Sequence, residues 1–423
     1  MKRIAFISEH ASPFAILGGV DAGGQNVYVS ELAKQLAAGG YLVDIFTRRE
    51  SPDVPRCVQW EEGVRVIHVD AGPPEVVNKE KLLPYMAAFR NDMLAFIKSS
   101  GIRYDLMHAN FFMSALVAME IKAILNIPYV VTFHALGHIR KLHQGEQDQF
   151  PAERVHIEEQ AMHTADAIIA ECPQDQEDLL RYYHPAAEKI KIVPCGVNLD
   201  ELYRIEKQAA RERLSLPQDE IILLQLGRMV PRKGIDNVIR SLASLDCQRR
   251  HIRLLVVGGD ANLAEQKGTE LFRLRQVAIE AGVQAAVTFT GQRKRDELKY
   301  YYSAADLFIT TPWYEPFGIT PLEAMACGTP VIGADVGGIK YSVADGVTGR
   351  LVPPNDPDAL AGAVDSLLAN PQALTAMGAQ AISRVKRLFT WNKVASQLDG
   401  IYSNIISRYK TATKELSEFR RAV

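Results

Sequence analysis

The chain has 423 residues, of which 47% are hydrophobic and 23% are charged, as in ordinary packed globular proteins. At roughly 150 residues per domain, this length predicts two domains, or at most three. The 48 basic and 50 acidic residues leave a net charge of -2, which argues against a general electrostatic role in binding nucleic acid.

The five cysteines lie far apart, and the sequence has no C-x-x-C motif or tight Cys/His cluster. This spacing favours neither a zinc site nor a disulfide framework, and it fits a reducing compartment. The apolar run at the start of the chain is too short for a signal peptide. No run reaches the roughly 20 apolar residues that a membrane helix needs. We therefore expect a cytoplasmic protein with no transmembrane segment and no nucleic-acid partner.

In the first half of the chain, short apolar runs alternate with helical patterns. Apolar residues recur at helical spacing over 26–38, and two glycines then end this helix. Strands separated by helices predict a parallel, doubly wound sheet. The predicted strands are 3–8, 42–47, 64–69, 106–109, 129–133, 167–170 and 190–193.

The second half repeats this organisation, and the pattern breaks between the halves in 194–218. We therefore expect an α/β chain of two doubly wound, Rossmann-like domains, 1–200 and 201–390, and a helical tail, 391–423, that returns to the first domain. Ligands of such sheets bind at the carboxyl ends of the strands, which predicts that the domains face each other across a cleft. The predicted strands are 221–226, 253–257, 287–290, 307–310 and 330–333.

Two loops that contain glycines, 18–24 and 227–234, each follow a strand and precede a helix. Such loops let a ligand approach the backbone and the positive end of a helix, although tight turns alone would explain either loop equally well. The first loop lacks the G-x-G-x-x-G spacing of nicotinamide-dependent oxidoreductases, which disfavours that class of enzyme.

Two carboxylates and a helix start lie within 313–328. Glu315 precedes a proline, which disfavours a helical backbone, so that Gly318 and Ile319 can present free amides where the helix begins. Such amides favour a bound anion. Glu323 lies one turn into this helix, where its carboxylate would accept hydrogen bonds from a ribose diol. The ordinary alternative for a lone Glu is a place on the surface of the first helical turn.

This segment is similar to the E-x-F-G-x-x-x-x-E signature of retaining GT-B glycosyltransferases, the glycosyltransferase 4 family in particular. Three further features resemble this family: the loop at 21–29, the P-x-G-V-[DN] segment at 194–198, and the basic pair Arg228 and Lys233. The resemblance implies a GT-B fold whose first domain binds an acceptor and whose second domain binds a nucleotide sugar. It also implies a retaining enzyme, and because no D-x-D motif sits after a strand in a position to hold a metal, we expect no metal and no other cofactor.

The resemblance also assigns roles to single residues. Arg228 and Lys233 would meet the charge that develops on the departing diphosphate, and His134 would contact the donor sugar. Together with Glu315 they form the predicted catalytic set, without a nucleophile, because the family favours front-face attack. The predicted donor site consists of Gly23, Gly24, Arg228, Lys233, Glu315, Phe317, Gly318, Ile319, Thr320 and Glu323.

Two other classes of protein fit the pattern less well. A glycosidase could use Glu315 and Glu323 as its two carboxylates, but it would have no use for the basic pair. A sugar-binding module without catalysis would not need the full charged set.

Within the family, the segments at 21–29 and 79–85 resemble sucrose-phosphate synthases and inositol-phosphate N-acetylglucosaminyltransferases. The first group predicts transfer of glucose from UDP-glucose to fructose 6-phosphate, giving sucrose 6-phosphate. The second group, or enzymes that extend a polysaccharide or glycolipid, is the alternative. Ala135 departs from the Ser of sucrose-phosphate synthases. The predicted acceptor site, whose cations would hold the phosphate, consists of Gly24, Gln25, Lys79, Arg140, Lys141 and Arg154.

Overall fold

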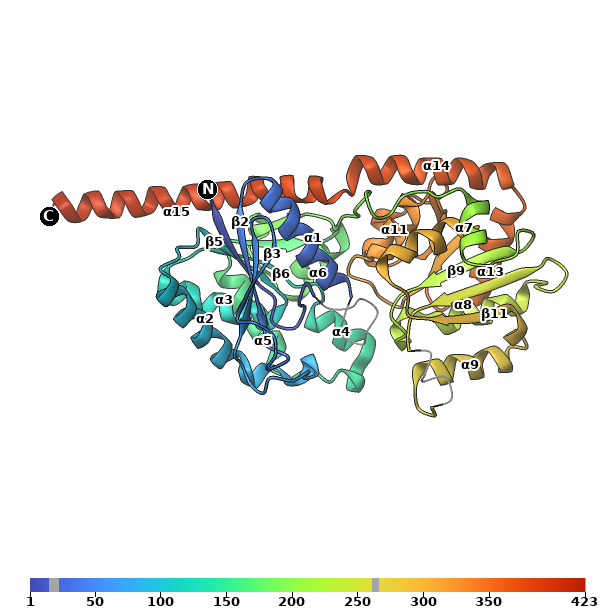
Figure 1. Cartoon of the computed structure of the whole chain (residues 1–423), viewed down its shortest axis with the longest axis horizontal. Coiled ribbons are helices and arrows are strands. Elements are labelled where there is room, and N and C mark those ends of the chain that lie inside the picture. Colours follow the sequence, from blue (N-terminus) through green and yellow to red (C-terminus); the bar gives the residue numbers. More distant parts are fainter. Residues whose placement is uncertain (15–22, 261–265, 423) are drawn as a thin grey trace. The chain divides into compact units, whose positions relative to one another are not determined.

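The computed structural model describes residues 1–14, 23–260 and 266–422. These residues divide into two compact units. The first unit comprises 1–14, 25–194 and 391–422, and the second comprises 23–24 and 195–390 without 261–265. In each unit, helices pack around one central sheet (Figure 1).

The first unit holds a sheet of eight described strands in the order β3-β4-β2-β1-β5-β6-β7-β8. Neighbouring strands are parallel, except that β3 pairs antiparallel with β4. The strands are β1 (Arg3–Ile7), β2 (Leu42–Arg48), β3 (Cys57–Glu61), β4 (Val64–Val69), β5 (Leu106–Asn110), β6 (Tyr129–Thr132), β7 (Ala167–Ala170) and β8 (Ile190–Ile192).

The helices of the first unit cover a mainly aliphatic and aromatic core. The α-helices are α1 (Gly24–Ala38), α2 (Met86–Ser100), α3 (Phe112–Leu125), α4 (Gly137–Gln144), α5 (Arg154–Thr164), α6 (Pro173–Tyr182) and α15 (Trp391–Ala422). Short 3-10 turns are η1 (Lys79–Lys81), η2 (Leu83–Tyr85), η3 (Gly145–Gln147) and η4 (Ala187–Lys189).

The second unit holds a parallel sheet of six described strands in the order β11-β10-β9-β12-β13-β14. Its strands are β9 (Ile221–Leu226), β10 (Ile252–Val257), β11 (Val287–Gly291), β12 (Leu307–Thr310), β13 (Val331–Ala334) and β14 (Gly349–Val352). Its α-helices are α7 (Lys207–Arg213), α8 (Ile235–Ser241), α9 (Glu270–Glu280), α10 (Leu298–Ala304), α11 (Ile319–Ala326), α12 (Gly337–Ser342), α13 (Pro357–Leu368) and α14 (Pro371–Leu388). The 3-10 turns are η5 (Pro231–Lys233), η6 (Leu242–Ser244), η8 (Gln284–Ala286) and η9 (Arg295–Glu297).

The structure confirms the expected α/β class and the two doubly wound sheets. Every predicted strand is present within one residue of its expected ends. Two strands at sheet edges, β3 and β14, are absent from the sequence prediction. Along β3, exposed and half-buried residues alternate, because it pairs antiparallel at an edge, so it lacks the apolar run of a buried parallel strand. β14 has only two apolar residues, too few for that pattern.

Among the parallel strands of each sheet the strand order reverses once, between β1 and β5 in the first unit and between β9 and β12 in the second. At such a switch point, the chain leaves two neighbouring strands towards opposite faces of the sheet, which opens a crevice at their carboxyl ends. The segments that follow these strands are therefore the places to look for a site in each unit.

Helix α15 packs along the first unit (Figure 1). Leu398 and Tyr402 are fully buried, and the Tyr402 hydroxyl lies 2.5 Å from Nδ1 of His108 on β5. Trp391, at the start of the helix, packs edge-on against Tyr28 with ring centroids 5.8 Å apart. Among the helices of the described chain, none is both long enough and apolar enough to cross a membrane.

The buried face of α15 predicts a clear effect on stability. Leu398→Ala should destabilise the protein by about 2–5 kcal/mol, because it removes a fully buried side chain and leaves a cavity. Ser396→Ala, on the exposed face of the same helix, should change stability by less than about 0.5 kcal/mol. Urea unfolding followed by circular dichroism measures both variants, and equal midpoints would contradict the packing of this helix.

Candidate functional site

Predicted site residues lie at the carboxyl ends of central strands in each unit. In the first unit, His134 lies two residues after the end of β6. In the second, Arg228 lies two residues after the end of β9, and Glu315 follows β12 by five residues. β9 and β12 are the neighbours at the switch point of the second sheet, so Arg228 and Glu315 leave adjacent strands.

Glu315 is the centre of a charge cluster in the second unit. Its carboxylate accepts hydrogen bonds from Lys233 Nζ at 2.5 Å and from Arg232 Nη1 at 3.3 Å. Burial alone would raise the pKa of Glu315, but the charges of Lys233, Arg232 and Arg228 lower it to about 2. Burial lowers the pKa of Lys233 to about 8, against the opposing effect of Glu315. At neutral pH the cluster therefore holds an ionised carboxylate among cations.

Two glycines allow the backbone segments around this cluster to approach each other. A Cβ at Gly234, where φ is +63°, would lie 2.0 Å from the carbonyl oxygen of Thr311. A Cβ at Gly338 would lie 2.3 Å from Cα of Phe317, and the Gly338 N–H donates to the Glu315 carbonyl at 3.2 Å. A side chain at either position would push the segment that carries Glu315 away from its partners.

The described end of the first glycine loop also belongs to the second unit. A Cβ at Gly23 would lie 3.3 Å from Nε of Arg228, and a Cβ at Gly24 would lie 3.6 Å from Cδ1 of Ile319. The structure thus brings Gly23 and Gly24 against two other members of the predicted donor site. The part of the loop at 18–22 lies outside the described residues.

Helix α11 begins where the sequence predicts, with Gly318 before it and Ile319 and Thr320 as its first residues. The first N–H groups of a helix have no acceptor within the helix and favour an anion. Phe317 is buried, so it supports this turn from the inside.

Glu323 is buried within α11 and is already hydrogen-bonded. Tyr302 donates its hydroxyl to Oε2 at 2.7 Å, and Arg295 donates to Oε1 at 3.1 Å. Arg295 also donates to Glu201 at 2.6 Å. Each carboxylate oxygen can accept a further bond, so the predicted ribose contact of Glu323 stays a prediction.

His134 lies in a left-handed backbone conformation, with φ of +59°. Its Nδ1 lies 3.1 Å from Oε1 of Glu171, and its Nε2 lies 3.1 Å from Oδ1 of Asn110. Tyr28 of α1 packs edge-on against the ring with centroids 4.8 Å apart. Such strain in a residue with a bulky ring persists only where its surroundings hold it, which marks His134 as a candidate functional residue.

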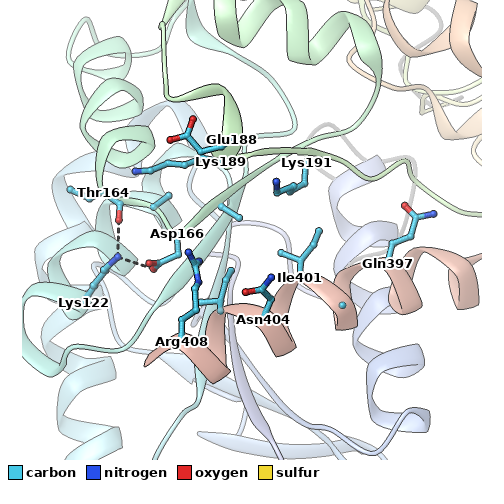
Figure 2. A pocket seen from close by; sticks show the side chains of 14 residues that line it. Lys122, Thr164, Asp166, Glu188, Lys189, Lys191, Gln397, Ile401, Asn404 and Arg408 are labelled. Carbon is cyan, nitrogen blue, oxygen red and sulfur yellow. Dashed lines mark hydrogen bonds and ion pairs between the residues drawn. The ribbon is translucent and has the colours of Figure 1, made fainter. Parts of the chain in front are cut away.

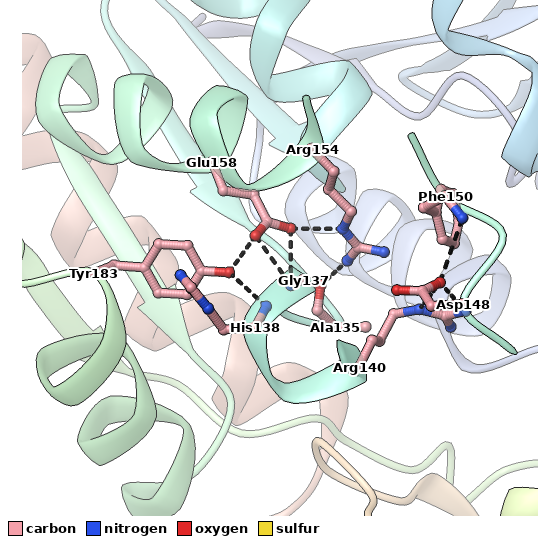
Figure 3. Close-up of polar contacts among 9 residues, drawn as sticks. All are labelled: Ala135, Gly137, His138, Arg140, Asp148, Phe150, Arg154, Glu158 and Tyr183. Carbon is pink, nitrogen blue, oxygen red and sulfur yellow. Dashed lines mark hydrogen bonds and ion pairs between the residues drawn. The ribbon is translucent and has the colours of Figure 1, made fainter. Parts of the chain in front are cut away.

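Arg154 is buried and supports the loop that follows β6 (Figure 3). It donates through Nε to Glu158 at 2.8 Å and through Nη2 to the Ala135 carbonyl at 2.5 Å, while Glu158 also accepts from the Gly137 N–H. Three phenylalanine rings surround the guanidinium, those of Phe111, Phe112 and Phe150. The sequence predicts Arg154 as an accessible ligand of the acceptor phosphate, but in the structure its side chain is buried. Of its guanidinium nitrogens, only Nη1 has no hydrogen-bond partner among the described residues.

The other predicted acceptor residues lie in several places. Gln25, on the first turn of α1, donates to Ser8 Oγ and the Asn110 carbonyl, both at 3.3 Å.

The remaining predicted cations lie on α4 and η1. Arg140 on α4 pairs with Asp148 at 2.9 Å and packs on Phe150, the ring that also covers Arg154. Lys141 is exposed on the same helix. Lys79 lies on η1 with its Nζ 3.5 Å from Glu80. The predicted convergence of these cations on one phosphate stays a prediction.

Several polar side chains at these sites are absent from the sequence prediction. Arg232, next to Lys233, pairs with Glu315. Asn110 and Glu171 end or follow strands, so the same rule that found His134 would have found them. Arg295 and Tyr302 have no local signal, because they reach Glu323 only through the packing of η9 and α10 against α11.

A cavity of about 550 Å³, lined largely by polar and charged residues, lies elsewhere in the first unit, between α15 and the amino ends of β7 and β8 (Figure 2). Lys122 lines it and pairs with Asp166, the residue before β7, and Lys191 and Arg408 lie nearby. The predicted site residues lie at the opposite, carboxyl ends of the strands, so this cavity is not the candidate active site. Within the described residues, no three His, Cys, Asp or Glu side chains gather closely enough to hold a metal ion.

Comparisons with known proteins agree with the two-sheet fold. Residues 22–201 match the family described as Glycosyltransferase Family 4, and residues 206–384 match the family described as Glycosyl transferases group 1. The chain is 37% identical to D-inositol 3-phosphate glycosyltransferase of Thermobispora bispora over 96% of both chains. It is 34% identical to the enzyme of the same name from Corynebacterium glutamicum, over 96% of this chain and 97% of that protein.

Solved structures give the same result for the fold. Sucrose-phosphate synthase from Thermosynechococcus elongatus superposes with a TM-score of 0.89 at 35% identity, over 96% of this chain and 100% of that one. HepE from Anabaena, solved with UDP-glucose, shares the fold with a TM-score of 0.74 at 21% identity, over 96% of this chain and 100% of that one. The chain therefore has a GT-B fold and belongs to glycosyltransferase family 4.

Proposed function

We propose that this glycosyltransferase is a retaining enzyme that moves a hexosyl group from UDP-glucose or a related nucleotide sugar to a small phosphorylated polyol. The observation that carries the donor half is the cluster of Arg228, Arg232 and Lys233 around Glu315. Cleavage of the donor leaves a nucleoside diphosphate, and cations fixed in advance stabilise the charge that develops on it.

Each part of the donor site has a proposed role. Arg228 offers a planar fork to two phosphate oxygens and Lys233 a point charge, while the first N–H groups of α11 meet the same diphosphate. Glu315 holds Lys233 in position and faces the sugar, and Glu323 accepts from the ribose hydroxyls. Gly23 and Gly24 let the diphosphate approach the backbone. The acceptor hydroxyl attacks the face that the diphosphate leaves, so no residue is assigned as a nucleophile and no metal is required.

For the acceptor, we propose D-inositol 3-phosphate first and fructose 6-phosphate second. Curated relatives named for the inositol phosphate match nearly the whole chain, and this supports the alternative of the sequence analysis better than its main expectation. The sucrose-phosphate synthase structure supports fructose 6-phosphate at similar identity. Both proposed acceptors carry a phosphate ester. The cations proposed to bind this phosphate are Lys79, Arg140, Lys141 and Arg154.

The function is tested by product analysis with UDP-glucose and UDP-N-acetylglucosamine as donors. We expect an α-linked product and unchanged turnover in EDTA. Each phosphorylated acceptor should have a kcat/KM about 10- to 100-fold above that of inositol or fructose, because a hydrogen bond to a charged group stabilises by about 1.5–3 kcal/mol. Lys79→Ala should reduce that preference, whereas Lys81→Ala, which removes an exposed lysine of the same turn, should keep it. Equal use of both acceptor forms would move the proposal to a glycan or lipid acceptor, and a β linkage would rule out retention.

The donor site is tested by three substitutions. Arg228→Ala and Glu315→Ala should each lower kcat/KM by about 100- to 1000-fold, because a fixed charge at the departing diphosphate, or its support, is lost. Glu323→Ala should mainly raise the KM for the donor, by the equivalent of about 1.5–3 kcal/mol. Glu201→Gln is the matched control, because it changes the other partner of Arg295 and should have little effect. A kcat/KM close to wild type in Arg228→Ala would remove the diphosphate assignment.

Lys233 should make the use of the donor depend on pH. Its pKa in the free protein is lowered to about 8, so the amine is charged below that pH and loses its charge above it. We expect kcat/KM for UDP-glucose to fall above about pH 8, while kcat stays level to higher pH, because the bound diphosphate stabilises the charged amine. In Lys233→Arg, whose guanidinium stays charged, this fall should disappear. An unchanged fall in that variant would assign the titration to another group.

A further inference from the structure

The surroundings of His134 determine which atoms of its ring carry protons. Oδ1 of Asn110 faces Nε2, and the Asn110 amide nitrogen donates to the carbonyls of Ile7 and His108 at 3.4 and 3.3 Å. Turning the amide over would place its oxygen against these two carbonyl oxygens. The amide orientation is therefore fixed, and Nε2 of His134 is the donor in this bond.

The other ring nitrogen, Nδ1, faces the carboxylate of Glu171. An ionised carboxylate can only accept, so Nδ1 is also a donor in this contact. Glu171 is buried, and its backbone N–H donates to Asp175 at 2.9 Å, which fixes the residue at the start of α6. Burial, and then the charge of Glu171, raises the pKa of Asp175 to about 8. At neutral pH, Asp175 is therefore mostly uncharged and does not add a second negative charge near the His134 ring.

Among the described residues, the other groups around the ring supply no further hydrogen-bond partner for its nitrogens. Tyr28 contacts it edge-on from α1. His108 of β5 is fully buried, and burial, with His134 nearby, lowers its pKa to about 3, so it stays neutral. Its two nitrogens contact Tyr402 and Thr132.

We propose that Glu171 is a positioning residue that holds His134 with a proton on both ring nitrogens, so that Nε2 meets a substrate oxygen as a hydrogen-bond donor and not as a base. The proposal rests on the proposed function, because it gives His134 a part in the transfer. In the free protein Nε2 donates to Oδ1 of Asn110, and under this proposal a substrate oxygen replaces that acceptor. The arrangement follows the common pattern in which a carboxylate on one imidazole nitrogen fixes what the other nitrogen does.

The protonation of the ring is measured without any substrate. In the ¹⁵N spectrum of histidine-labelled protein at neutral pH, the His134 signals are identified by their loss in His134→Gln. We expect both ring nitrogens to be protonated in the wild type and only one in Glu171→Gln, whose amide cannot balance a charged ring. Glu31→Gln, which changes a buried carboxylate beside Lys34 on α1, should leave the His134 signals unchanged. A neutral His134 ring in the wild type would overturn the proposal.

Kinetics then separate positioning from general stability. Glu171→Ala should lower kcat by about 10- to 100-fold with a change in donor KM of less than about threefold, and Glu171→Gln should recover part of kcat. A kcat within about twofold of wild type in Glu171→Ala, together with a large loss in His134→Ala, would overturn the role of Glu171 and leave the proposed function intact. No sugar transfer by the wild type would overturn the proposed function, while the ¹⁵N spectrum would still decide the state of the ring.

Discussion

The pairing of the Glu315 carboxylate is the interaction on which the second unit depends. A charge removed from water is costly unless it is paired, and the partners of Glu315 come from a loop 82 residues earlier in the chain. The two segments meet because β9 and β12 are neighbours at the switch point of the sheet. Gly234 and Gly338 let the backbones close around the carboxylate. The need to neutralise this largely buried carboxylate thus accompanies the gathering of Arg228, Lys233 and the start of α11 in one place.

The first unit satisfies its polar strand ends in a similar way. The segment after β6 is held on one side by the contact between His134 and Glu171, and on the other by Arg154 and Glu158, which bind the Ala135 carbonyl and the Gly137 N–H. These bonds fix a short, strained segment on rigid elements. A site that is preorganised in this way can hold a substrate in a defined geometry.

In the proposed function, the first unit binds the acceptor. Relatives with two different names, one for an inositol phosphate and one for sucrose phosphate, share 37% and 35% identity with the chain, so overall similarity does not separate them. Position 135 contributes its carbonyl to Arg154 and, being alanine, no hydroxyl. Under the proposed function, the charged and aromatic residues around Arg154, whose guanidinium is covered by Phe150, are the proposed source of discrimination between acceptors.

The order of strands and helices and the family can both be predicted from the amino-acid sequence. Apolar runs fix parallel strands within one residue, because such strands are buried on both faces. The signature around Glu315 and Glu323 and the pair Arg228 and Lys233 are local patterns, so they are visible without coordinates. The edge strands β3 and β14 escaped this reasoning, since an edge needs no continuous apolar run.

Which polar groups contact each other becomes clear only from the packing of the elements. Arg154, expected as a phosphate ligand, is buried against Glu158 and three aromatic rings. Glu323 is bound by Tyr302 and Arg295, and His134 by Glu171. These contacts join residues from different elements. Each forms because a polar group that loses water in the packed protein needs a hydrogen-bond or charge partner, and the spacing of residues along the chain does not show which partner that is.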